Sequence, residues 1–172
     1  LFSARFTVRK RPLDLIEAVS KIPNSNIVLL FVGDGLEKDN MKELSDKYNI
    51  KSIFTGFKGQ KELPKYYSIA DLYVITSDYD ASPKSLNEAL NFELPILATD
   101  KVGTSIDLVK NGYNGYIVKS LDVKSIAKKI DFFNRNREIS IEMGEKSLLI
   151  SNDWSIDHDV IGIKEAINYI LR

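Results

Sequence analysis

The 172-residue sequence predicts an α/β fold, with a single doubly wound parallel sheet, helices on both of its faces and a helical C-terminal tail. Three observations support this fold class. Short apolar runs alternate with segments of helical period, the apolar runs contain few polar residues, and three helical segments follow the final strand. Strands read as nearly continuous apolar runs when helices cover both faces of a parallel sheet, because neither face meets water.

The first half of the chain is expected to contain three strands and two helices. The strands are Phe2 to Ala4, Asn26 to Phe31 and Ser52 to Thr55, and the helices are Pro12 to Ile22 and Glu37 to Tyr48. Pro12 suits the first turn of its helix, where the missing N–H of proline removes no hydrogen bond. By their spacing, Met41, Leu44 and Tyr48 share one face of the second helix. Gly56 ends the third strand.

The second half continues the alternation and then becomes helical. Its strands are Asp71 to Thr76, Pro95 to Thr99 and Tyr116 to Val118, and its helices are Lys61 to Ile69, Ser85 to Phe92, Val123 to Phe133, Ile139 to Ile150 and Ile156 to Leu171. No internal repeat, low-complexity tract or linker interrupts this order. The elements therefore predict one Rossmann-like domain over residues 1–172, and such sheets bind their ligands beyond the carboxyl ends of the strands.

Composition excludes several other classes of protein. The chain has 24 Lys and Arg against 24 Asp and Glu, so its net charge gives no electrostatic reason to bind nucleic acid or an acidic membrane. It has no Cys, which excludes disulfides and thiolate catalysis. No apolar run approaches the roughly 20 residues that span a bilayer. The sequence begins at Leu1, directly before an expected strand, and we expect it to be a fragment of a longer chain.

Four cations follow the first expected strand, namely Arg5, Arg9, Lys10 and Arg11. They precede a helix, whose N-terminus carries about half a positive charge. Arg offers a planar fork of donors and Lys a point charge, and both suit phosphate oxygens. The cluster is therefore a candidate for holding a diphosphate, and a solvated loop rich in Lys and Arg is the alternative.

The second strand is followed by a glycine turn, Gly33-Asp34-Gly35. A dinucleotide-binding fingerprint needs a third glycine, but the residue at that position is Lys38. The turn therefore does not indicate a dinucleotide site, and the residues favour a tight connection between a strand and a helix.

The segment from Ser77 to Glu88 carries most of the candidate chemistry. Asp80 lies before an expected helix and Glu88 lies inside it, and the residues between them can present free backbone N–H groups at the helix start. The two carboxylates could hold hydroxyl groups at two ends of one ligand. Alternatively, Ser82 caps the helix and Glu88 faces solvent. A further alternative is that Asp78 and Asp80 form a D-x-D site for Mg²⁺ or Mn²⁺.

Taken in order along the chain, these motifs resemble the C-terminal, donor-binding half of the retaining glycosyltransferases of family 4, which have the GT-B fold. The matching pieces are Ala4-Arg5 with Lys10, Leu15 to Ala18, Val32 to Gly35, Phe54 to Gly56, Leu63 to Asp71, Asp80 to Leu90, Pro95 to Thr99 and Asn114 to Val118. Asp80 and Glu88 correspond to the two acidic positions of the family's E-x7-E motif. The resemblance extends over nearly the whole chain and implies one half of a GT-B fold.

The resemblance implies a role for each matching residue. Arg5 and Lys10 would hold the donor diphosphate, and Asp80 would bind hydroxyls of the transferred sugar. Glu88 would bind the ribose hydroxyls of the nucleotide, and the base would lie near Phe57. Catalytic roles would belong to Arg5, Lys10 and Asp80, and donor-binding roles to Gly33, Gly35, Gly56, Phe57, Ser82, Pro83, Lys84, Ser85, Leu86 and Glu88. The resemblance implies no metal and no cofactor, because the nucleotide sugar is a substrate.

The implied function is that of a hexosyltransferase-like enzyme in polysaccharide or glycoconjugate biosynthesis. Together with an N-terminal acceptor domain that this chain lacks, the domain would transfer a sugar from a nucleotide-diphospho-sugar to an acceptor hydroxyl with retention. We expect the fragment alone to be inactive.

The implied partners follow from the same resemblance. The acceptor, a glycan, lipid or protein, would be met through the missing domain, as would any membrane, and nucleic acid is not an expected partner. The implied location is cytoplasmic and includes the inner membrane surface. The alternative function is a non-catalytic nucleotide-sugar-binding or scaffold domain of the same fold.

Several positions depart from the family pattern. Asp80 is one methylene shorter than the usual Glu, Ala4 replaces a Gly, and Glu93 replaces the Gly that precedes the Pro-Val step. The Gly-Gly expected near the donor sugar is Val102-Gly103. These departures bear on sugar choice and activity, and they leave the fold prediction unchanged.

Overall fold

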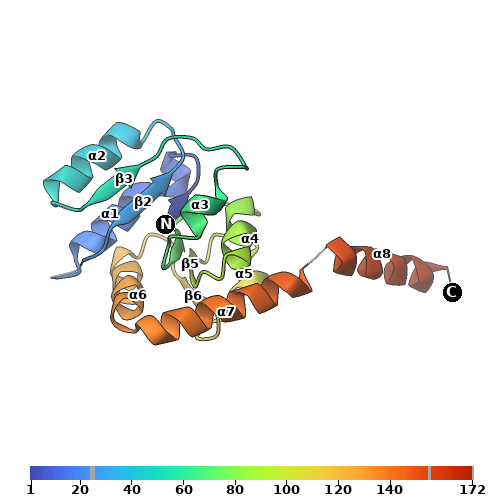
Figure 1. Cartoon of the computed structure of the whole chain (residues 1–172). Coiled ribbons are helices and arrows are strands. Elements are labelled where there is room, and N and C mark those ends of the chain that lie inside the picture. Colours follow the sequence, from blue (N-terminus) through green and yellow to red (C-terminus); the bar gives the residue numbers. More distant parts are fainter. Residues whose placement is uncertain (24–25, 155, 172) are drawn as a thin grey trace.

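The computed structural model describes residues 1–23, 26–154 and 156–171, which form a parallel α/β body with one protruding helix (Figure 1). The described strands are β1 (Phe2–Ser3), β2 (Leu29–Val32), β3 (Ser52–Phe54), β4 (Tyr73–Ile75), β5 (Ile96–Thr99) and β6 (Gly115–Val118). They pair in parallel as two three-stranded sheets, of order β1-β2-β3 and β4-β5-β6. The register pairs Phe2 with Phe31 and Leu97 with Tyr116.

The two sheets meet along β1 and β4 through Leu1. The N–H of Val74 donates a hydrogen bond to the carbonyl of Leu1 (3.0 Å), and the nitrogen of Leu1 donates one to the carbonyl of Leu72 (2.7 Å). The strands therefore lie side by side in the order β3-β2-β1-β4-β5-β6, which confirms the predicted doubly wound sheet. Strand order reverses between β1 and β4, and ligands of such sheets bind beyond the carboxyl ends at that point.

The described helices include all the expected ones, but their bounds are shorter, longer or shifted by a few residues. They are α1 (Pro12–Ser20), α2 (Lys38–Lys47), α3 (Pro64–Tyr67), α4 (Lys84–Asn91), α5 (Ser105–Leu108), α6 (Val123–Arg135), α7 (Arg137–Asp153) and α8 (Ile156–Ile170), with the 3-10 turn η1 (Val8–Lys10) before α1. Periodicity does not predict η1 and α5, because three or four residues are too few to show a helical repeat. β2 begins at Leu29 rather than at the expected Asn26.

Alternate residues of the central strands point to opposite faces of the sheet, and each face has its own apolar cluster. In β4, Val74 packs into one cluster, whereas Tyr73 and Ile75 pack into the other. In β5, Leu97 belongs to the first cluster and Ile96 to the second. Side chains of α1 and α6 complete the first cluster, and those of α3 and α4 contribute to the second, so helices cover both faces.

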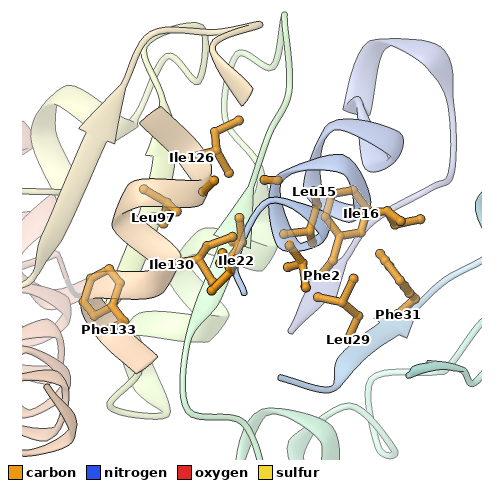
Figure 2. Close-up of a cluster of buried hydrophobic side chains, with 14 of the residues drawn as sticks. Phe2, Leu15, Ile16, Ile22, Leu29, Phe31, Leu97, Ile126, Ile130 and Phe133 are labelled. Carbon is orange, nitrogen blue, oxygen red and sulfur yellow. The ribbon is translucent and has the colours of Figure 1, made fainter. Parts of the chain in front are cut away.

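The first cluster fixes α1 against the sheet. Figure 2 shows side chains from α1, β1, β2 and α6 gathered within it. Phe2, Leu15, Ile16 and Phe31 are each at most 1% exposed. Fully burying a side chain of this size contributes about 1.5–3 kcal/mol. Because β1 and α1 are both held in this way, the loop between them is anchored at the carboxyl edge of the sheet.

α8 runs out from the body in Figure 1, and every described side chain from Asp157 to Leu171 is exposed. Its apolar residues Val160, Ile163 and Ile167 are 42%, 60% and 51% exposed. Neither apolar cluster includes any of the α8 side chains that the structure describes. Among the residues that the structure describes, no helix is both long enough and apolar enough to cross a membrane.

Candidate functional site

A cavity of about 720 Å³ lies beyond the carboxyl ends of β1 to β4, where the strand order reverses. Its lining residues are Ser3, Ala4, Arg5, Lys10, Val32, Gly33, Asp34, Gly35, Phe57, Lys58, Leu63, Asp80, Pro83, Lys84, Ser85 and Glu88. The loops after these four strands contribute most of them, and α4 contributes its first two turns. The cavity is therefore lined by cations and by carboxylates that come from separate parts of the sequence.

Most of the predicted site residues line this one cavity. They are Arg5, Lys10, Gly33, Gly35, Phe57, Asp80, Pro83, Lys84, Ser85 and Glu88. The first two follow β1, the glycines follow β2, Phe57 follows β3, and the rest follow β4. A parallel sheet brings these loops together because the carboxyl ends of its strands share one edge.

Three predicted donor-binding residues do not line the cavity. Gly56 lies beside Phe57, and its carbonyl accepts a hydrogen bond from the N–H of Gly33 at 3.0 Å. Ser82 is exposed outside the cavity. Leu86 is fully buried in the second apolar cluster, because it lies on the face of α4 that packs onto the sheet. The side chain of Leu86 therefore cannot contact a ligand in the cavity.

Lys10 and Asp80 form an ion pair across the cavity. The ammonium of Lys10 comes from the end of η1, and the carboxylate of Asp80 comes from the loop between β4 and α4. Their side chains are 24% and 13% exposed, so both charges are largely shielded from water. The pair brings a cation and an acid of the predicted site into direct contact.

The loop that carries Lys10 is fastened to the end of β4. The buried hydroxyl of Thr76 lies 3.0 Å from the carbonyl oxygen of Lys10 and 2.8 Å from that of Arg11, and it donates to them. The N–H of Asp78 donates to the carbonyl of Arg9 at 2.9 Å. These bonds fix the backbone around Lys10 relative to β4, and so they limit how far its ammonium can move.

Asp80 is held from its other side by the loop that follows β5. Its N–H donates to the carbonyl of Lys101 (3.0 Å), and its carbonyl accepts from the N–H of Gly103 (2.7 Å). A Cβ at Gly103 would lie 2.4 Å from the carbonyl oxygen of Ala81, so only glycine fits there. Val102 is 1% exposed and packs into the second apolar cluster. The departure at Val102 therefore places no side chain in the cavity.

The glycine turn after β2 is explained by close backbone contact. A Cβ at Gly33 would lie 1.9 Å from the carbonyl oxygen of Ala4, and one at Gly35 would lie 2.2 Å from that of Phe6. Both glycines also have positive φ, at 140° and 157°. The turn thus lets the loop after β1 lie directly against the loop after β2, in agreement with the tight connection that the sequence favours.

Between these glycines, Asp34 keeps its carboxylate ionised. Lys38 donates to it at 2.7 Å and the N–H of Gly35 donates at 2.8 Å, and these two hydrogen bonds hold the pKa of Asp34 below its ordinary value. The sequence does not predict Asp34 as a cavity residue, because Asp is also a common turn residue and the glycines on either side already indicate a turn.

The first turns of α4 present two kinds of group to the cavity. No described residue accepts a hydrogen bond from the backbone N–H groups of Lys84 and Ser85, so these remain available to an anion. Glu88 accepts a hydrogen bond from the hydroxyl of Tyr67 at 2.7 Å, and Ser85 accepts one from that of Tyr73 at 2.7 Å. Pro83 occupies the N-cap position of α4, and no side chain accepts a capping hydrogen bond there. The alternative in which Ser82 caps the helix is therefore wrong.

Of the two carboxylates in the alternative metal site, Asp78 and Asp80, only Asp80 lies in the cavity. Asp80 lines the cavity and pairs with Lys10, whereas Asp78 is not among the lining residues. Within the described part of the chain, no group of three or more His, Asp or Glu side chains is placed to hold a metal ion.

Sequence reasoning missed several lining residues and both supporting tyrosines. Ser3 is buried near the end of β1, and Lys58 follows the predicted Phe57. Their positions next to predicted site residues are the signal that could have found them. Tyr67 and Tyr73 are not next to a predicted site residue, and the sequence pattern assigns them no role at the site.

A second cavity, of about 480 Å³, lies at the opposite edge of the sheet. Leu1, Leu29, Leu72 and Pro95, which line it, precede or begin strands. Its lining is mainly apolar. Its charged residues are Asp71, Glu93 and Arg137, of which Asp71 and Arg137 lie 3.5 Å apart on the exposed surface. The residues with candidate chemistry are therefore concentrated in the first cavity.

The chain is similar to known proteins over most of its length. The model of the family described as "Glycosyl transferases group 1" matches residues 1–148. An uncharacterized glycosyltransferase of Haemophilus influenzae is 28% identical over 137 residues, which are 80% of this chain and 38% of that protein. The amylovoran biosynthesis glycosyltransferase AmsD of Erwinia amylovora is 30% identical over 114 residues, or 66% of this chain and 32% of that protein. The chain thus spans about a third of these relatives.

Solved structures show the same fold. Anabaena Alr3699/HepE in complex with UDP has a TM-score of 0.82 at 21% identity, over 99% of this chain and 47% of that one. A variant of Staphylococcus aureus TarM, solved with fondaparinux, alpha-GlcNAc-glycerol and UDP, has a TM-score of 0.77 at 26% identity, over 85% of this chain and 30% of that one. In each case the chain corresponds to half of the solved protein or less.

Proposed function

The chain belongs to the group 1 glycosyltransferase family, and on this premise we propose that residues 1–172 are the donor-binding domain of a retaining glycosyltransferase. The domain would bind a nucleotide-diphospho-sugar in the cavity between β1 and β4. A second domain of the full-length protein would supply the acceptor, a glycan, lipid or protein. Relatives named for amylovoran and lipopolysaccharide core biosynthesis support a role in making polysaccharides or glycoconjugates.

One observation carries this proposal: Arg5, Lys10 and Glu88 line the same cavity, although they come from separate loops. In the proposed binding mode, Arg5, Lys10 and the free N–H groups at the start of α4 hold the diphosphate. Asp80 accepts hydrogen bonds from hydroxyls of the transferred sugar, and Glu88 accepts them from the ribose. Phe57 lies at the end of the cavity formed by the loop after β3, where the base would be placed.

The proposed reaction breaks the bond between the sugar C1 and the β-phosphate oxygen. C1 then forms a bond to the acceptor hydroxyl oxygen, the hydroxyl proton passes to the departing β-phosphate oxygen, and the nucleoside diphosphate leaves. Negative charge grows on the leaving diphosphate, and the fixed positive groups stabilise it without taking or giving a proton. Removing one such group costs about 3 kcal/mol, or roughly a hundredfold in rate.

Transfer assays of the full-length protein with UDP-, GDP- and ADP-sugars test the proposal. We expect Arg5→Ala, Lys10→Ala and Glu88→Ala each to lower transfer about a hundredfold. Arg9→Ala is the matched control, because Arg9 is an exposed cation of the same loop outside the cavity lining. Unchanged transfer in all three variants would favour a binding or scaffold domain instead.

A separate experiment tests whether donor binding and acceptor binding belong to different domains. Residues 1–172 alone should bind the nucleoside diphosphate in a calorimetric titration and should transfer no sugar, since in the proposed function another domain binds the acceptor. Transfer by these residues alone would contradict the assignment of acceptor binding to another domain.

A further inference from the structure

Two buried tyrosines lie behind the cavity-facing side of α4. Tyr67 is the last residue of α3 and Tyr73 is the first residue of β4, and each is 1% exposed. Neither lines the cavity. Their hydroxyls reach Glu88 and Ser85, which do line it. Two of the α4 side chains that line the cavity are thus supported from the interior of the domain.

The ring of Tyr67 is held in place by its neighbours. It stacks on Phe92 at a centroid distance of 5.5 Å and an interplanar angle of 16°, and it packs at 6.2 Å from the ring of Tyr73. With the ring packed on several sides, the position of the hydroxyl is set by the core and does not depend on a ligand.

The hydroxyl of Tyr67 remains a hydrogen-bond donor at any physiological pH. Burial, followed by the nearby Tyr73 hydroxyl, raises the pKa of Tyr67 well above its ordinary value. The bond therefore runs from a neutral phenol to the carboxylate of Glu88, which is a charge-assisted hydrogen bond. It occupies Oε2, and no described residue donates a hydrogen bond to Oε1.

We propose that Tyr67 is a positioning residue, whose hydroxyl holds Oε2 of Glu88 so that Oε1 faces the ribose hydroxyls of the bound nucleotide. This inference rests on the proposed function, since it takes the nucleotide sugar as the ligand of the cavity. A free Glu side chain loses rotamer freedom when it binds a ligand, and a side chain that is already fixed does not. Tyr67 would therefore raise nucleotide affinity without touching the nucleotide.

A purely structural role makes a different prediction. In that case Glu88 merely gives a partner to a buried hydroxyl, and loss of the bond would disturb α4 as a whole. The N–H groups at the start of α4 would then move too, and binding of a diphosphate without ribose would suffer equally. Inorganic pyrophosphate distinguishes the two roles, because it can occupy the diphosphate site but offers nothing to Glu88.

The experiment uses the full-length protein and calorimetry. UDP, GDP and ADP are titrated first, and the one that binds best is used with inorganic pyrophosphate on wild type, Tyr67→Phe, Glu88→Ala and the double variant, at a temperature where all are folded. We expect Tyr67→Phe to weaken nucleotide binding about tenfold. Its pyrophosphate affinity should stay within about twofold of wild type, and Tyr67→Phe should add no loss to Glu88→Ala. Tyr66→Phe, on the same helix, is the control and should bind like wild type.

Other outcomes separate the two proposals. Equal losses for nucleotide and pyrophosphate, or a full additional loss in the Glu88→Ala background, would assign Tyr67 a structural role and overturn its positioning role. Unchanged nucleotide binding by Tyr67→Phe would overturn it as well, and both results would leave the proposed function standing. Failure of the wild type to bind any of the three nucleotides would refute the proposed function, and the role of Tyr67 with it.

Discussion

The ammonium of Lys10 and the carboxylate of Asp80 form an ion pair that joins the β1 side of the cavity to its β4 side, although 70 positions separate them in the sequence. The pair is partly buried, so its charges are screened less than those of an exposed ion pair. In the proposed function Lys10 binds the diphosphate and Asp80 binds hydroxyls of the transferred sugar. Their contact would therefore place the two groups beside the bond that breaks.

Replacing Asp80 should impair transfer of the sugar while leaving binding of the nucleotide nearly unchanged. Asp80→Asn keeps the size of the side chain and removes its charge, and we expect transfer by the full-length protein to fall about a hundredfold. Affinity for the nucleoside diphosphate, which lacks the transferred sugar, should change less than about threefold. Steady-state assays give the first quantity and calorimetry the second. Asp78→Asn should leave both unchanged, and a large loss of nucleotide affinity in Asp80→Asn would contradict its assignment to the sugar.

Stability at alkaline pH should depend on Tyr73. Burial raises the pKa of Tyr73 above its ordinary value of 10.0, while the unfolded chain keeps the ordinary value. Above pH 10 the unfolded state therefore loses a proton that the folded state retains, and the free energy of unfolding falls as the pH rises. One tyrosine contributes a slope of at most about 1.4 kcal/mol per pH unit.

Urea unfolding between pH 9 and 11.5 measures this slope. We expect Tyr73→Phe to lose stability less steeply with pH than wild type, because phenylalanine has no proton to lose. Tyr66→Phe is the comparison, since the side chain of Tyr66 is only partly buried. Parallel curves for wild type and Tyr73→Phe would contradict the raised pKa.

Glu93 stands where the resemblance in the sequence implies a glycine, and the backbone at this position suits glycine. Its φ is 54°, in the left-handed region just after α4, which costs a non-glycine residue about 1 kcal/mol. We therefore expect Glu93→Gly to raise the free energy of unfolding by about 1 kcal/mol and the melting temperature by roughly 3 °C. Glu17→Gly, inside α1, should lower stability by a similar amount. A lower melting temperature for Glu93→Gly would show that its side chain matters more than its backbone.

Gly144 allows α7 to lie directly against the end of α4. A Cβ at this position would lie 2.0 Å from the carbonyl oxygen of Glu93, and backbone atoms cannot move aside cheaply. We expect Gly144→Ala to lower the free energy of unfolding by about 2 kcal/mol. Gly162→Ala in α8 is the matched control, because no atom lies within 4 Å of a Cβ there, and thermal unfolding should show no loss. Equal melting temperatures for the two variants would contradict this account of the α4–α7 contact.

Much of the fold can be predicted from local patterns in the sequence, namely apolar runs, helical periodicity and turn residues. Continuous apolar runs predict β4 and β5, and Pro12 marks the start of α1 where the structure begins it. Expected strand ends also place Arg5, Lys10, Asp80 and Glu88 at one edge, because the carboxyl ends of parallel strands meet there. Short elements escape this reasoning: η1 has three residues and α5 has four, too few for a periodic signal.

The sequence by itself thus determined the alternation of strands and helices and the set of loops from which the candidate site is built, since local periodicity and turn residues encode both. Only the tertiary structure decided that β1 lies beside β4, that Lys10 meets Asp80, and that Tyr67 supports Glu88. The tertiary structure also decided that the side chains of Leu86 and Val102 lie in the core and that the described side chains of α8 lie outside it. These outcomes depend on strand order and side-chain packing between residues far apart in the chain, and no local pattern carries that information.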